Sequence, residues 1–139
     1  MTDVFNDIFT MVATAVRNEY PGCFVTGEWV NAPAQFPTVS VVEADNYVDA
    51  ASRDNSLTEN VTVLMYQVTV YSNLTSGKRY ECAKILGFID DLLRVKNFTR
   101  IARSESYYDT EKTIYTMTAR YRVRVGKREQ DGSFNLYTI

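Results

Sequence analysis

The sequence predicts an α+β fold, in which an antiparallel sheet of about five or six strands carries two helices packed on one face. Three observations predict it. Two long segments place apolar residues at helical spacing, several runs of β-branched and aromatic residues alternate with polar ones, and the segments follow the order α-β-β-β-α-β-β. The length of 139 residues and the apolar share of 45% indicate one globular domain, 1–139, that can hold a core without metal or disulfide.

The two helices are predicted at residues 3–19 and 78–96. The first has its apolar residues on one face and ends at Pro21. The second leaves only a narrow polar stripe, so we expect one face on the sheet and another on the first helix or on a neighbouring subunit. Thr75 or Ser76 is its expected N-cap.

Six segments are predicted as strands, of which the last is short: 23–29, 36–43, 61–72, 98–104, 115–125 and 134–139. The 61–72 segment is apolar on both faces, so it belongs in the sheet interior or in a hairpin arm that another subunit covers. The 115–125 segment alternates most regularly, with Tyr115 and Tyr121 on one face and three arginines on the other.

Residues 44–60 are predicted as a long acidic loop. They show neither a helical nor a strand period, and they carry four acids against Arg53 alone: Asp45, Asp49, Asp54 and Glu59. Loops of this length inside a compact domain are usually functional or flexible. The loop is therefore either a candidate contact arm or a mobile excursion without a partner.

Charge is divided unevenly along the chain. Residues 1–60 hold nine acids and two bases, a net −7, whereas residues 61–139 hold eight acids and thirteen bases, a net +5. The overall charge of −2 argues against a general duplex-binding protein. The two halves either neutralise each other on one molecule, or let an acidic face of one subunit meet a basic face of the next in a closed ring.

Catalytic and metal chemistry are not indicated. The chain has no histidine, which excludes a Ser-His-Asp triad, a Cys-His dyad and imidazole zinc sites. Cys23 and Cys82 have no ligand cluster nearby, so both are expected to be buried, reduced thiols. Asp90 and Asp91 point about 100° apart on a helix, and Asp90 is expected to pair with Arg94 instead. We expect no enzyme, no cofactor, no metal and, without an apolar run of membrane length, no membrane partner.

Five elements in order give the chain a recognisable layout. They are an N-terminal helix closing at Tyr20-Pro21-Gly22, a strand at 36–41, a long strand at 61–72, an aliphatic helix after the polar turn 73–78, and the alternating strand 115–125. This layout, which covers nearly the whole chain, resembles the tail terminator proteins of long-tailed bacteriophages, also called tail completion or minor tail proteins.

The resemblance implies a structural virion protein of the tail or neck, present in the host cytoplasm during assembly. Such proteins form a ring, commonly a hexamer, that caps the tail tube, ends its polymerisation and offers a docking surface to the connector of the filled head. The implied partners are further copies of the chain, the tail tube protein, and the head-tail connector or head-closure protein. Sequence-specific nucleic acid is not among them, although the genome would pass through the ring.

A closed ring has heterologous contacts, so each subunit needs two unlike, complementary patches. We expect acids of the 44–60 segment to meet one of two arginine groups of the next subunit. The first group is Arg120, Arg122 and Arg124, and the second is Arg100 and Arg103. The C-terminal segment is expected to be a strand whose backbone is free to pair with another chain: Phe134, Leu136, Tyr137 and Ile139.

Two other functions stay open. A head-closure or neck adaptor protein would share the ring and differ only in its neighbours. A small nucleic-acid-binding or ligand-binding module would use the arginine stripe with tyrosines as stacking partners: Tyr107, Tyr108, Tyr115 and Tyr121. Because Tyr115 and Tyr121 are expected on the face opposite the arginines, the sequence favours the ring.

Overall fold

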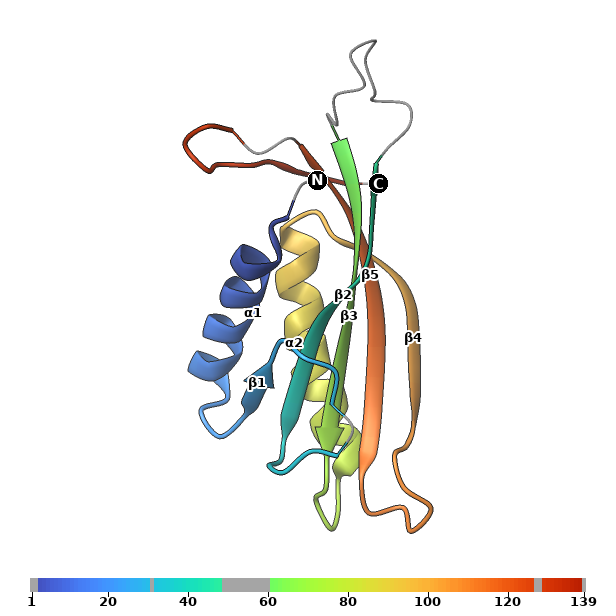
Figure 1. Cartoon of the computed structure of the whole chain (residues 1–139). Helices are drawn as coiled ribbons and strands as arrows, with labels where there is room; N and C mark the ends of the chain where they lie inside the picture. Colours follow the sequence, from blue (N-terminus) through green and yellow to red (C-terminus); the bar gives the residue numbers. More distant parts are fainter. Residues whose placement is uncertain (1–2, 31, 49–60, 127–128, 139) are drawn as a thin grey trace.

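The computed structural model describes residues 3–30, 32–48, 61–126 and 129–138. Within these residues the elements follow one another as α1 (Phe5–Glu19), β1 (Phe24–Thr26), β2 (Thr38–Val48), β3 (Val61–Ser72), α2 (Lys78–Val95), β4 (Thr99–Tyr107), β5 (Tyr115–Gly126) and β6 (Leu136–Tyr137). The architecture is α+β, as the sequence predicts (Figure 1). No helix of the described residues is long and apolar enough to cross a membrane.

The sheet is mixed, with the strand order β1-β2-β3-β5-β4 and β6 paired to β5. The pairs β2/β3, β3/β5 and β5/β4 are antiparallel, whereas β1 runs parallel to β2. The prediction of a purely antiparallel sheet is therefore wrong at β1. After β1 the chain passes over β2 and β3, where the carbonyls of Glu28 and Val30 accept hydrogen bonds from Ser40 and Tyr71. It then returns to enter β2 in the same direction as β1.

β2 is longer than predicted, because it continues to Val48. The expected loop 44–60 is wrong in its first residues: after a bulge, Asp45 and Asn46 pair with Met65 and Leu64 of β3. The polar composition of this stretch is compatible with a strand because Ala44 and Asp45 are exposed. Pairing with β3 outweighs the low strand propensity of these residues. The remainder of the loop, with Asp49, Asp54 and Glu59, lies outside the described residues.

The core joins both helices to β3 and β5. Tyr66 and Tyr121 are cross-strand neighbours that project from the same face, and both are buried. The ring of Phe5 on α1 stacks on Tyr66, with 6.2 Å between ring centroids, and the Tyr121 hydroxyl donates to Asp90 on α2. Contacts from both helices thus reach the face that carries these two tyrosines, which we call the inner face; the other side is the outer face.

β3 is buried along most of its length and pairs on both sides, which confirms its expected place in the interior of the sheet. Helix α2 has the expected extent, but its N-cap is Gly77, and neither Thr75 nor Ser76 caps it. The chain enters the helix with a φ of 85° at this residue, a left-handed conformation that glycine adopts at little cost. The local turn geometry therefore decides the cap.

Candidate functional site

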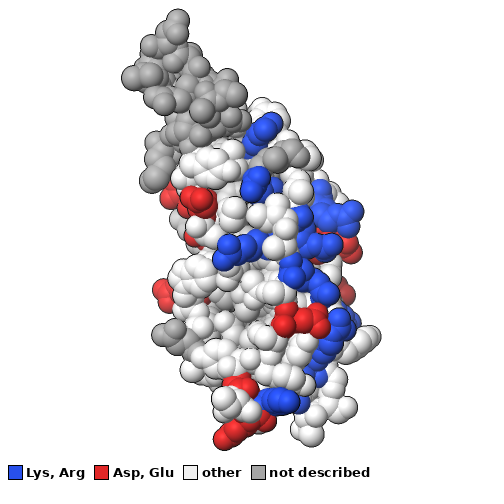
Figure 2. Space-filling model, turned by 90° about the vertical axis from the view of Figure 1, so that its right-hand side faces the viewer, with Lys and Arg blue, Asp and Glu red and all other residues white. Residues whose placement is uncertain are grey.

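The clearest accumulation of positive charge lies where the edge strand β4 meets α2. Two carboxylates are each shared there by two arginines, a group of six side chains that we call the basic edge: Asp90 with Arg94 and Arg100, and Glu105 with Arg79 and Arg103. Four guanidinium groups against two carboxylates leave an excess of positive charge. Figure 2 looks at the molecule from the β4 side and shows a band of Lys and Arg running along it, broken by few acids.

Asp90 is the buried centre of the basic edge. Its carboxylate accepts hydrogen bonds from the Tyr121 hydroxyl at 2.8 Å and from Arg100 Nη1 at 3.1 Å, and Arg94 Nη1 lies at 3.7 Å. The predicted Asp90–Arg94 pair is confirmed, while the shorter contact to Arg100 was not foreseen. Arg100 reaches Asp90 because it is the cross-strand neighbour of Tyr121, so both side chains project from the inner face toward α2.

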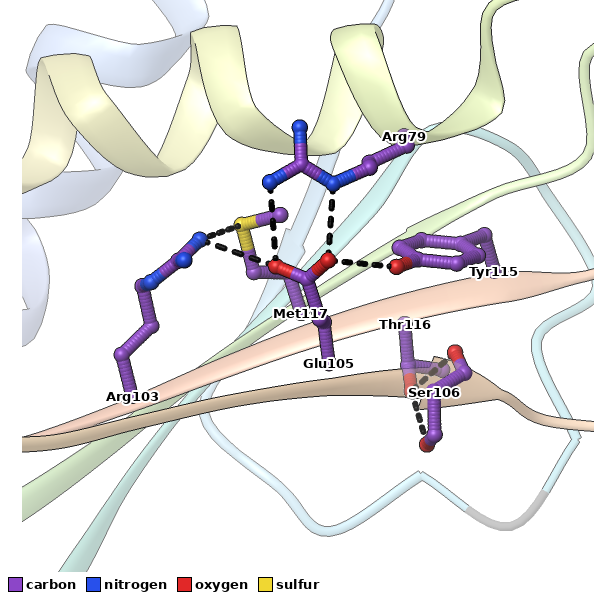
Figure 3. A network of polar contacts seen from close by, with 7 residues as sticks. All are labelled: Arg79, Arg103, Glu105, Ser106, Tyr115, Thr116 and Met117. Carbon is purple, nitrogen blue, oxygen red and sulfur yellow. Dashed lines mark hydrogen bonds and ion pairs between the residues drawn. The ribbon is translucent and has the colours of Figure 1, made fainter.

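Glu105 organises the other half of the basic edge (Figure 3). Its oxygens accept hydrogen bonds from Arg79 Nε at 2.7 Å and from the Tyr115 hydroxyl at 2.9 Å, and Arg103 Nη1 lies at 3.0 Å. The hydrogen bond from Arg79, then that from Tyr115, lowers the pKa of Glu105 below its usual value. The carboxylate is thus charged at neutral pH and holds both arginines in place.

A cavity of about 320 Å³ opens between α2 and β4, at the basic edge. Its lining includes Gly87 and Asp91 of α2 as well as Asp90, Arg100 and Arg103. No side-chain atom would meet a Cβ at Gly87, so the cavity is open at this point of the helix. The described residues contain no group of histidine, cysteine or carboxylate side chains that could hold a metal ion.

The other predicted arginine group lies on the opposite side of the sheet. Arg120, Arg122 and Arg124 alternate with buried residues of β5 and project from the outer face. Their neighbours on β3 are Gln67, Met65 and Val63, and Arg120 Nε donates to Gln67 Oε1 at 3.0 Å. The structure therefore separates the two arginine groups by face, although both lie toward the same edge of the sheet.

Three of the four tyrosines that would stack nucleic-acid bases project from the inner face, and the fourth, Tyr108, packs edge-on against Tyr71 with 5.9 Å between ring centroids. Tyr115 and Tyr121 are buried on the inner face, as the alternation predicts. Tyr107 is the cross-strand neighbour of Tyr115, so it also projects from the inner face. The geometry therefore disfavours a base-stacking groove along the outer arginines.

Negative charge gathers at the edge of the sheet opposite β4, along the part of β2 that β1 does not cover. We call the acids found there the acidic edge: Asp3, Glu43 and Asp45. Burial raises the pKa of Glu43, and the neighbouring Asp3 and Asp45 raise it further. Glu43 accepts a hydrogen bond from Tyr66 on the inner face, whereas Asp45 is exposed and pairs with Met65, whose side is the outer face. Each face of the β2 edge thus carries an acid.

The C-terminal segment is less free than expected. Leu136 and Tyr137 of β6 pair with Val125 and Arg124 of β5, so that one edge of the strand is already used within the chain. Phe134 packs against the core, and Ile139 lies outside the described residues. The prediction of a free backbone is wrong for the edge of β6 that faces β5.

Both cysteines are buried and reduced, as predicted. Burial, and then the charge of Glu81, raises the pKa of Cys23 to about 11 and that of Cys82 to about 12. At neutral pH both are protonated thiols without nucleophilic character.

Comparison with known proteins adds no family. No protein-family model matches the chain, and no curated protein matches it. Function is therefore inferred from the layout of the chain and from its two oppositely charged edges.

Proposed function

We propose that this chain is a virion assembly protein that forms a ring on the end of a phage tail tube. The observation that carries the proposal is the placement of unlike charge at two different edges of one sheet, acids along β2 and arginines along β4 and β5. Two unlike patches on one subunit suit heterologous contacts, and such contacts close into a ring when the rotation between subunits is right.

The layout supports the same proposal. The helices and the long strands occur in the order that resembles tail terminator proteins, and at the top of Figure 1 the end of β2 and the start of β3 extend beyond both helices. A ring of such subunits would act through shape. One rim matches the last ring of the tube, and the other presents a surface that accepts the head connector and refuses another tube subunit.

The test is tube elongation. Purified tube protein is allowed to polymerise with and without this chain, and tube lengths are measured by electron microscopy. We expect shorter tubes with one end capped, because a bound ring blocks the addition of subunits at that end. Tubes that elongate normally, with no protein bound at their ends, would refute the proposal.

The same assay separates the terminator from a neck adaptor. An adaptor would share the heterologous ring but would bind the head connector and leave tube elongation unchanged. Sedimentation of the chain with tail tubes and, in parallel, with isolated connectors distinguishes the two. We expect it to sediment with tubes.

A further inference from the structure

Two strand edges of the sheet are unpaired among the described residues. β4 ends the sheet on one side, and all its residues after Thr99 are exposed. On the other side β1 covers only Thr38, Val39 and Ser40 of β2, and no other strand of the described residues lies along that side of β2. An uncovered strand edge presents a row of backbone N–H and C=O groups that can pair with another strand.

The two edges match in direction. β2, β3, β5 and β4 alternate in direction because each neighbouring pair is antiparallel. With four strands in the series, the first and last run in opposite directions. Copies repeated head to tail around an axis along the strands would therefore bring β4 of one beside β2 of the next as another antiparallel pair.

The edges also overlap along the strands. Through β3 and β5, residues 41–45 of β2, which β1 leaves uncovered, lie level with residues 99–103 of β4. Five paired residues would form a ladder of about 16 Å.

Charge is complementary on both faces of such a junction. On the inner face, Glu43 of β2 would meet Arg100 and Arg103 of β4. On the outer face, Asp45 would meet Arg120, whose neighbour on β4 is Ala102, a side chain too short to keep them apart. A β4–β4 junction would bring arginines against arginines, so the charges favour the unlike pairing.

Exposed apolar side chains lie on the same two edges. Ile101 and Tyr107 of β4 and Tyr47 of β2 are each at least 40% exposed. Large apolar and aromatic residues of this kind are typical of the centre of an interface.

We propose that a second copy of this chain occupies the edge of β4 with the residue 41–45 part of its β2, so that the sheets of neighbouring subunits join into one sheet around the ring, with an antiparallel pair at each junction. This inference rests on the proposed ring and specifies how its subunits bind each other. Backbone hydrogen bonds hold the junction, and the acids and arginines of the two edges select the partner strand.

Disulfide trapping tests the junction. Six double variants combine a cysteine on β2, Ala44→Cys or Asn46→Cys, with one on β4, Ala102→Cys, Ser104→Cys or Ser106→Cys. Within one chain β3 and β5 separate these strands by about 14 Å, too far for a disulfide, so every cross-link joins two copies. With pKa values of about 11 and about 12, the native Cys23 and Cys82 stay unreactive at pH 8.

We expect at least one of these pairs to give a ladder of linked copies on a non-reducing gel. The control, Asn18→Cys on the exposed side of α1 with Ser104→Cys, should stay unlinked. If the unmodified chain forms oligomers in native mass spectrometry but none of the six pairs gives cross-links, the proposed junction is wrong and the proposed ring is not contradicted. If the unmodified chain forms no oligomer and the variants give no cross-links, both the junction and the ring are wrong.

Discussion

Two variants that each stay monomeric should assemble when they are mixed. The first, Arg120→Glu, makes the β5 side of the junction acidic, and the second, Asp45→Arg, makes the β2 side basic. In either variant alone, like charges face each other at every contact between subunits. In an alternating ring of the two, each contact again pairs an acid with a base, so assembly is restored.

Mass photometry at low salt checks this result for each variant and for their equimolar mixture. Low salt matters because exposed charges are screened over about 10 Å at 0.1 M ionic strength. Lys84→Glu, an equal charge reversal on α2, is the matched control and should assemble like the unmodified chain, because Lys84 lies over the Tyr20 ring and away from both edges. If either variant alone assembles to the same extent as the unmodified chain, Asp45 and Arg120 do not face each other at the junction.

Replacing Asp90 should lower the free energy of unfolding more than the Asp45 and Arg120 substitutions do. Asp90→Ala leaves the buried hydroxyl of Tyr121 without its acceptor and removes the ion pairs to Arg94 and Arg100. An unsatisfied buried hydroxyl costs about 1–3 kcal/mol. The arginines are half-exposed, so their pairs add no more than about 1 kcal/mol each. We expect the free energy of unfolding to fall by about 2–3 kcal/mol.

Urea unfolding measures this loss. The neighbouring residue gives the control, since Asp91 is exposed and Asp91→Ala should change the free energy of unfolding by less than about 0.5 kcal/mol. A double-mutant cycle with Tyr121→Phe should show that most of the loss disappears when the hydroxyl is absent. Equal effects of Asp90→Ala and Asp91→Ala would show that the buried network does not hold α2 on the sheet.

The sequence predicts most of the fold because its periodicities are strong. The apolar face of α1, the doubly apolar β3 and the strict alternation of β5 each have one way to bury their side chains. The parallel β1 and the extension of β2 could not be predicted in the same way. They depend on where the 27–37 segment crosses the sheet and on pairing with β3, which are tertiary properties.

The candidate site could be predicted only in part. Spacing along α2 predicts the Asp90–Arg94 pair, because both residues lie on one helix. The contacts of Arg100 with Asp90 and of Arg79 with Glu105 join strands to a helix distant in the chain, and no local pattern reports that register. Alternation predicts that Arg120, Arg122 and Arg124 share a face. The sequence alone could not show that the basic edge lies on the other face of the sheet.

The mass of the unmodified chain in solution shows whether its unlike edges bind each other. If its unlike edges bind each other, native mass spectrometry at micromolar concentration should show one closed oligomer; six copies of the 15.9 kDa chain would give about 95 kDa. Negative-stain images of the same sample should show rings. A monomer of 15.9 kDa at every concentration and salt tested would show that the edges do not bind each other and that no ring forms.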